Sequence, residues 1–140
     1  MRTLALIITF FLSTFMSQAQ TESTGQTITV TINNIKNNTG KVIMSLHSVD
    51  TFMKTNGLQS AESIIEKNKV IITFKNVLPG EYAIMSVHDE NDNKQMDFEL
   101  NGMPKESYGV SNNPMSYGPP QFSEAKFTLN NENINMSIIF

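Results

Sequence analysis

The residues whose types and spacing best suit chemistry lie in one acidic segment, HDENDNKQMDFE, at positions 88–99. It contains five acids and one lysine, which gives a local charge of 1 − 5 = −4. Short Asp and Asn side chains occupy positions 1, 3, 5 and 9 of a calcium-loop pattern: Asp89, Asn91, Asn93 and Asp97. Gln95 stands at position 7, where a backbone carbonyl serves as a ligand. Calcium takes about six to eight oxygen ligands in flexible geometry, so the pattern predicts a calcium site.

Two positions depart from the helix-loop-helix form of this pattern. Lys94 stands where that motif uses glycine for a sharp turn, and Leu100 replaces the bidentate glutamate at position 12. Glu99 or Glu106 is the expected substitute for that glutamate. Because a strand leads into the segment, we interpret it as a calcium loop on a β scaffold, with a weak dissociation constant of about 10⁻⁴ to 10⁻³ M. The alternatives are a metal-free loop of Asx-turns, in which Asp and Asn bond their own backbone, and a site for another ion or ligand.

The two histidines are a second candidate for chemistry. His88 adjoins Asp89 and is a candidate general base or zinc ligand, with Glu106 as a further acidic partner. With no cysteine and only His47 besides, the chain offers zinc few of its usual ligands. The alternative is a histidine at a strand end that is bonded to a neighbour.

A third candidate is a group of aromatic and amide side chains further along the chain. Tyr108, Tyr117 and Phe122 lie near Asn112 and Asn113. Sugar and peptide sites combine rings, which supply contact area, with amides, which supply hydrogen bonds. The alternative is a packed loop that uses the same amides to satisfy its own backbone.

Short strands with turns between them must position these groups. Period-two alternation, clearest where Ile28, Val30 and Ile32 alternate with threonines, predicts six strands at 26–35, 41–47, 70–74, 81–88, 125–129 and 134–140. The pattern is typical of a single antiparallel, Greek-key β-sandwich. Residues 61–67 suit a short helix capped by Ser60, with Ile64 and Ile65 turned inward.

The periodicity stops between residues 88 and 124. This stretch holds four of the five prolines and three of the seven glycines, which fix turns. It also carries apolar side chains able to pack: Phe98, Leu100, Met103, Tyr108, Val110, Met115, Tyr117 and Phe122. We therefore expect a long, ordered loop that caps one end of the sandwich.

The amino terminus has the pattern of a secretory signal peptide. Arg2 precedes an apolar run at 4–16, and Ser17 and Ala19 supply small residues for cleavage after position 19. The run of 13 residues is short for a membrane span, which needs about 20, so a retained anchor is the weaker alternative. Removal of 1–19 leaves 140 − 19 = 121 residues, and 20–140 is predicted to be one domain without a transmembrane segment.

Composition narrows the class of protein. The chain has no cysteine, so an exported domain must be held by packing or metal, and no cysteine is present to carry a lipid. Without the leader, nine lysines face thirteen acids, a net charge of 9 − 13 = −4. Nucleic-acid-binding proteins show the opposite balance, so nucleic acid is not an expected partner.

Several motifs together resemble one bacterial family, called domain of unknown function 2141. They are LPGEYA at 78–83, HDEN at 88–91, Asp97, GMPKE at 102–106, YGVSNN at 108–113 and FSEA at 122–125. The resemblance spans roughly 28–140 and implies export but no assigned activity. The Leu-Pro-Gly-x-Tyr turn is also similar to that of transthyretin-like and collagen-adhesin B-type sandwiches, accessory or spacer modules that often have calcium loops.

The sequence therefore predicts an exported, periplasmic or secreted, non-catalytic β-sandwich, stabilised by calcium at the acidic loop. Its cap is expected to bind an unknown protein or a cell-envelope component. The alternative function is a hydrolase that uses His88 with Asp89 or Glu106.

Overall fold

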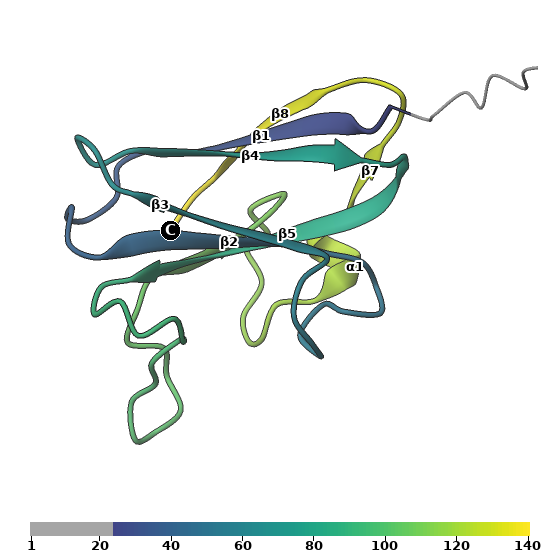
Figure 1. Cartoon of the computed structure of the whole chain (residues 1–140). Helices are drawn as coiled ribbons and strands as arrows, with labels where there is room; N and C mark the ends of the chain where they lie inside the picture. Colours follow the sequence, from purple (N-terminus) through teal and green to yellow (C-terminus); the bar gives the residue numbers. More distant parts are fainter. Residues whose placement is uncertain (1–23) are drawn as a thin grey trace, which may run out of the picture.

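A computed structural model describes residues 24–140, and the predicted leader at 1–19 lies outside the described residues. The described chain forms two packed sheets, as Figure 1 shows, which confirms the all-β sandwich. In chain order the elements are β1 (Gln26–Ile32), β2 (Lys41–His47), β3 (Gln59–Ile64), β4 (Val70–Val77), β5 (Gly80–Asp89), β6 (Tyr108–Val110), α1 (Phe122–Ala125), β7 (Phe127–Leu129) and β8 (Ile134–Ile138). No helix within residues 24–140 is long and apolar enough to cross a membrane.

The first sheet has the order β4-β1-β8, and the second has the order β3-β2-β5-β6. β7 pairs with the beginning of β5, and β6 pairs with its second half. One pairing departs from the expected antiparallel arrangement, because β1 and β8 run parallel. β8 reaches the first sheet from β7 in the other sheet rather than through a hairpin with β1, so its direction is not reversed.

The main core lies between the sheets. Alternate residues of three strands are buried there: Ile28, Val30 and Ile32 of β1, Val42, Met44 and Leu46 of β2, and Val70, Ile72 and Phe74 of β4. Burial of each such side chain contributes about 1.5–3 kcal/mol relative to exposure. The period-two pattern read from the sequence is therefore the pattern that builds the sandwich.

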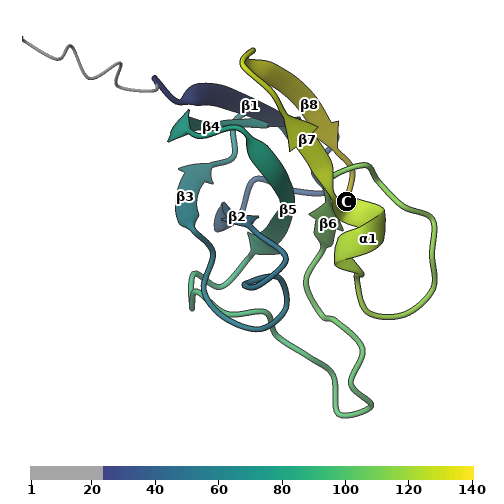
Figure 2. The same ribbon diagram turned by 90° about the vertical axis from the view of Figure 1, so that its right-hand side faces the viewer.

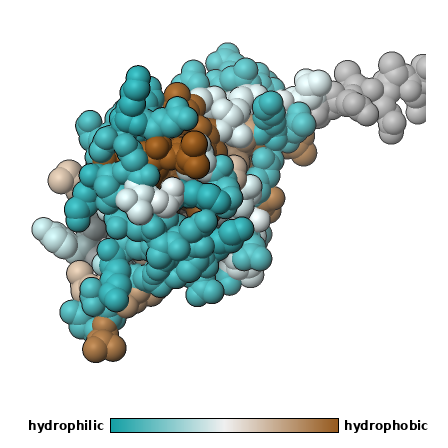
Figure 3. Space-filling view, turned by 60° about the vertical axis from the view of Figure 1, so that its left-hand side comes forward, coloured by the Kyte–Doolittle hydropathy of each residue, from teal (hydrophilic) through white to brown (hydrophobic). Residues whose placement is uncertain are grey.

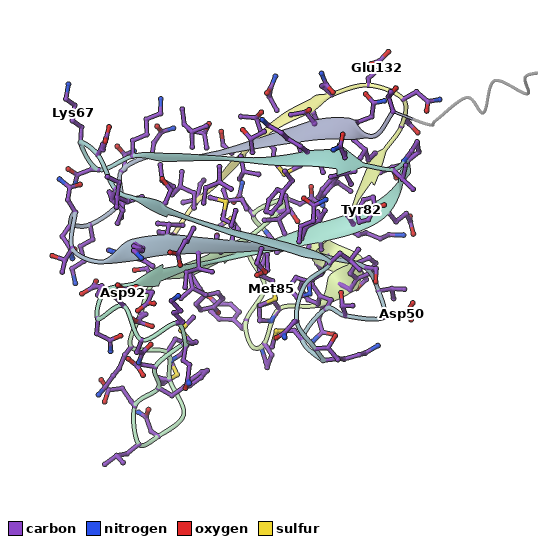
Figure 4. The ribbon with its side chains drawn as sticks, viewed as in Figure 1. Asp50, Lys67, Tyr82, Met85, Asp92 and Glu132 are labelled. Atoms are coloured by element: carbon purple, nitrogen blue, oxygen red, sulfur yellow. The ribbon has the colours of Figure 1, made fainter. Side chains whose placement is uncertain are left out.

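β5 carries side chains to both faces of the second sheet. Tyr82 and Ile84 pack into the main core, whereas Ala83 and Met85 pack on the outer face. Figure 4 shows Tyr82 directed between the sheets and Met85 directed away from them. A smaller cluster of Phe52, Ala83, Val110 and Ala125, flanked by Met85 and Phe122, covers part of this outer face.

The helix predicted at 61–67 is wrong. β3 occupies Gln59–Ile64 and pairs antiparallel with β2 at the edge of the second sheet. Ile65 is buried, but Ile64 is 60% exposed, because neighbouring residues of a strand face opposite sides. Pairing with β2 outweighs the weak local preference for helix.

The segment between 88 and 124 is less irregular than predicted. It contains β6 and begins α1, which lies beside β6 in Figure 2. Val110 and Phe122 pack in the outer cluster, as expected. Leu100, Met115 and Tyr117 do not pack, because they are 109%, 98% and 104% exposed.

Candidate functional site

The acidic loop, residues 89–106, leaves the end of β5 and returns to β6. In Figure 1 it projects beyond the second sheet, away from the first. Its far part is a narrow turn in which Phe98 bridges to Pro104, and Gly102 adopts a φ of 83°. The loop is thus an extension of β5 and β6 with its base anchored in the sandwich.

The first half of the acidic loop is curled by side chains that accept backbone N–H groups. Asp89 is completely buried, and its two carboxylate oxygens accept the N–H groups of Asn93 and Lys94, at 3.1 and 2.8 Å. Asn91 Oδ1 and Asn93 Oδ1 each accept the N–H two residues further on, at 3.1 and 2.9 Å. Lys94 has a φ of 62°, so it adopts the left-handed conformation for which the helix-loop-helix motif uses glycine.

Hydrogen bonds link the four residues predicted at positions 1, 3, 5 and 9. The Asp97 carboxylate accepts the Nδ2 group of Asn91 at 2.6 Å and that of Asn93 at 3.1 Å. Asn93 is also bonded to Asp89 through its backbone N–H. Gln95 contributes its own N–H to the same network, by donating to Asn93.

The two glutamates that were expected to replace the ligand at position 12 lie in different places. Glu99 is exposed and starts the far turn, where its backbone N–H donates to Met103 O at 2.7 Å. Glu106 is only 7% exposed. Its two oxygens accept the N–H groups of Glu90 and Asp97, at 3.0 and 3.2 Å, so it fastens both sides of the acidic loop.

The hydrogen bonds of the acidic loop determine which side-chain oxygens could bind a cation. Within residues 24–140, no group of three or more His, Cys, Asp and Glu side chains is arranged to hold a metal. The four residues predicted to bind calcium through their side chains are instead two carboxylates, Asp89 and Asp97, and two amides, Asn91 and Asn93. Each Asp89 oxygen accepts one backbone N–H, and the amides of Asn91 and Asn93 direct their Nδ2 groups to Asp97. These contacts form a network of Asx-turns, and calcium binding stays a prediction.

Lys41 of β2 connects the loop to the sheet. Its Nζ lies 2.9 Å from Glu62 Oε1 and 3.5 Å from Asp92 Oδ1. The hydrogen bond to Glu62, followed by the nearby charge of Asp92, raises the pKa of Lys41 above its usual value of 10.5. Part of the loop's negative charge is therefore balanced at its first turn.

His88 is placed in the interior. It is 0% exposed, its Nε2 lies 2.8 Å from Thr39 O, and its ring stacks on Phe140 with 6.3 Å between centroids. Its Nδ1 lies 3.7 Å from Glu90 Oε1 and has no hydrogen-bond partner among residues 24–140. Asp89 points to the opposite side of the strand. The structure therefore does not pair His88 with Asp89, and it bonds the ring to a neighbouring backbone group.

The side-chain amides of Asn112 and Asn113 bind backbone groups. Asn112 Nδ2 donates to the carbonyls of Glu124 and Lys126, at 3.2 and 2.6 Å. Asn113 donates to Ser137 O at 3.0 Å and accepts the N–H of Ile139 at 2.9 Å. These bonds occupy the groups that were candidates for ligand contact.

Tyr108 and Tyr117 lie in different environments. Tyr117 is 104% exposed, whereas Tyr108 lines an apolar groove on the outer face of the second sheet. The amides and the two rings therefore do not form one site.

Sequence reasoning missed an apolar groove of about 510 Å³ on the outer face of the second sheet. We call it the methionine groove, because Met53, Met85, Met96 and Met103 line it together with Val87, Phe98, Gly102, Pro104, Tyr108, Gly118, Pro119 and Pro120. β5 supplies the floor, the acidic loop one wall and residues 118–120 another. The sequence held one sign of this groove, the apolar residues on either side of Asp97. Met96 and Phe98 line the groove, whereas Asp97 binds the amides of the acidic loop.

Of two pockets found within residues 24–140, the methionine groove is the larger. A shallower pocket of about 300 Å³ lies beside the edge strands, at Ser63, Ile64, Glu66, Lys69, Val70 and Ile71. The face turned forward in Figure 3 is mainly hydrophilic, with small apolar areas. The methionine groove and the acidic loop that walls it are therefore the candidate site.

The motifs noted in the sequence gather around the candidate site. LPGEYA covers the turn before β5 and the first residues of that strand, HDEN and GMPKE lie at the two ends of the acidic loop, and YGVSNN contains β6. Residues 30–137 match the family model described as an uncharacterized protein conserved in bacteria (DUF2141). The chain belongs to this family. No curated protein and no solved structure matches it significantly. The likeness to transthyretin-like sandwiches stays a prediction.

Proposed function

We propose that this member of the family is an exported, non-catalytic binding module. The methionine groove takes an apolar group of its partner, and the acidic loop binds calcium. The observation that carries the proposal is the groove itself. Its volume of about 510 Å³ lies within the range of about 300–1,000 Å³ that is usual for ligand pockets, and its lining is mostly apolar.

The exposure of the side chains that line the groove supports a binding role rather than a packing role. Met53, Phe98 and Met103 are 54%, 58% and 62% exposed, although each is a large apolar side chain. Apolar side chains that gather around one hollow and stay uncovered are typical of interaction sites. Methionine is unbranched and polarizable, so these side chains can adapt to the shape of an apolar group.

Calcium has a specific role in this proposal. Asp97 is the residue on which both loop amides converge, and its neighbours Met96 and Phe98 line the groove. A cation held by Asp89, Asn91, Asn93 and Asp97 would fix the backbone of this wall. Calcium would then order the groove without contacting the partner.

The leader pattern at 1–19 supports export, and an exported protein would meet the millimolar calcium that a weak loop of this type needs. The hydrolase alternative requires an accessible base. His88 is 0% exposed and lies on the opposite side of β5 from Asp89, so the geometry favours binding over hydrolysis.

The binding function can be tested with N-phenylnaphthylamine, an apolar probe whose fluorescence rises in apolar surroundings. We expect a saturable rise with the wild-type protein and a clear loss with Met85→Gln, which places an amide on the groove floor. Met115→Gln is the matched control, because Met115 is 98% exposed and outside the groove. No rise with the wild type, or equal binding by both variants, would refute the function.

A further inference from the structure

We infer that Met53 and Met103 are oxidation sites, at which a peroxide converts the thioether to a sulfoxide and thereby weakens binding of apolar ligands in the methionine groove. This inference rests on the binding function proposed above and adds a chemical control of the same site. It is carried by the distribution of methionine in the chain and by the exposure of these two side chains at the groove.

Methionine is concentrated in the groove rather than in the core. The chain has nine methionines, of which seven belong to residues 24–140, and four of these seven line the groove. The buried residues of the main core are mostly isoleucine and valine, and within residues 24–140 they include one methionine, Met44. Oxidisable sulfur is therefore gathered where an apolar ligand would bind, and the packing of the sandwich depends little on it.

Two of the four groove methionines are open to solvent. Met53 is 54% exposed and Met103 is 62% exposed, whereas Met85 and Met96 are half-buried. Met53 belongs to the turn after β2, and Met103 belongs to the returning side of the acidic loop. Because a peroxide must reach the sulfur from solvent, Met53 and Met103 react before the half-buried pair.

The reaction needs a peroxide, such as hydrogen peroxide, as its oxidant. A lone pair of the sulfur attacks one peroxide oxygen, the S–O bond forms as the O–O bond breaks, and the other oxygen leaves as water after proton transfer. The thioether is oxidised by two electrons, and the peroxide is reduced by two. The chain has no cysteine, so no thiol competes with the thioethers for the oxidant. Methionine sulfoxide reductases reverse the step.

A sulfoxide at these positions changes the chemistry of the groove. The residues that line the groove include no charged side chain, so an apolar ligand meets mainly apolar atoms. A sulfoxide is polar, and its oxygen needs a hydrogen-bond partner that an apolar ligand cannot supply. Binding of an apolar group should therefore weaken. A sulfoxide at Met115, which is 98% exposed and outside the groove, should have no effect.

The test treats the folded wild-type protein with hydrogen peroxide, removes the excess with catalase, and locates sulfoxides by peptide mass spectrometry. We expect sulfoxide at Met53, Met103 and Met115, and none at Met44, which is fully buried. N-phenylnaphthylamine should bind at least about fivefold more weakly to the oxidised protein. The two methionine sulfoxide reductases, which act on opposite epimers, should together restore the affinity.

Leucine variants assign the effect to the two residues. The double variant Met53→Leu/Met103→Leu keeps apolar side chains of similar volume, so it should bind the probe before treatment and lose less than about twofold in affinity after it. Met115→Leu is the matched control and should lose affinity as the wild type does. Full loss of affinity in the treated double variant would overturn the inference. So would sulfoxide at Met53 and Met103 without weaker binding, or absence of sulfoxide at both positions.

The outcomes distinguish this inference from the proposed function. A probe that binds the untreated protein and is insensitive to oxidation leaves the groove as a binding site and overturns only the control by oxidation. Unfolding of the treated wild type, seen in its thermal melt, would assign the loss of binding to the core and would also overturn the inference. Absence of probe binding by the untreated protein overturns the inference and the proposed function together.

Discussion

Glu106 holds Asp97 by its backbone: Glu106 Oε2 accepts the Asp97 N–H at 3.2 Å, while the other oxygen accepts the N–H of Glu90 at 3.0 Å. The carboxylate is almost completely buried at the base of the acidic loop. One side chain, located just before β6, therefore fastens the outgoing and returning sides of the loop. The wall of the methionine groove depends on this attachment.

Glu106→Gln should loosen the acidic loop. An amide presents an N–H₂ group to one of the two backbone donors, so one buried hydrogen bond is lost and a donor is left unpaired. We expect a loss of about 1–3 kcal/mol in the free energy of unfolding, measured by urea denaturation, and weaker N-phenylnaphthylamine binding. Glu99→Gln is the control and should change stability by less than about 0.5 kcal/mol, because Glu99 is exposed. Equal effects would contradict the role of Glu106.

Calcium should stabilise the folded protein. With a dissociation constant of about 10⁻⁴ to 10⁻³ M, 10 mM calcium adds about 1.4–2.7 kcal/mol to the free energy of unfolding. Thermal melts with calcium and with chelator measure this as a higher midpoint. Asp97→Asn should abolish the shift, whereas Asp50→Asn should keep it, because Asp50 lies in the turn after β2, outside the loop. Identical midpoints for the wild type would rule out the calcium site.

Two glycines with similar backbone angles should respond differently to alanine. Gly40 and Gly102 have φ values of 69° and 83°. A Cβ at Gly40 would clash with the backbone oxygen of Asp89, whereas one at Gly102 would meet nothing within 4 Å. Gly102→Ala should lower the free energy of unfolding only by the strain of a left-handed alanine, about 1–2 kcal/mol. Gly40→Ala should lower it clearly more, because the new Cβ also clashes. Urea denaturation of both variants measures the difference, and equal losses would show that the loop base does not contact the turn at residue 40.

His47 should make stability depend on pH. It is 4% exposed, and burial lowers its pKa below the usual 6.5, so the folded state favours the neutral ring. This stability is fully present above the unfolded pKa of about 6.5 and is lost as pH falls below it, because the unfolded chain binds the proton more readily. His47→Gln keeps a polar group near Thr51 but does not titrate. Its free energy of unfolding should fall less between about pH 7.5 and 5.5, and parallel curves would contradict the effect.

The sequence predicted the parts of the fold that depend on local pattern. β1 and β2 follow from alternation of β-branched and apolar residues, since one face of each strand is buried. β3 was mistaken for a helix because its stability comes from pairing with β2, which no local pattern reveals. β6 has only three residues and depends on its pairing with β5 in the same way.

The candidate site was predicted in part. Hydrogen bonds join Asp89, Asn91, Asn93 and Asp97, because all four belong to one curled segment, and the calcium site predicted from their spacing stays a prediction. The methionine groove could not be predicted, because its lining comes from residues 53, 85–87, 96–104, 108 and 118–120, which only the tertiary structure brings together. The interior position of His88 likewise depends on the register of β5 with β2.

Methionine methyl resonances offer the most direct test of the account. In a protein labelled with ¹³C at its methionine methyl groups, N-phenylnaphthylamine should shift the signals of Met53, Met85, Met96 and Met103, and calcium should shift those of Met96 and Met103. Met44, buried in the main core, should not respond. Shifts confined to methionines outside the groove, or no shift at saturating N-phenylnaphthylamine and calcium, would contradict the claim that the acidic loop and β5 form one binding site.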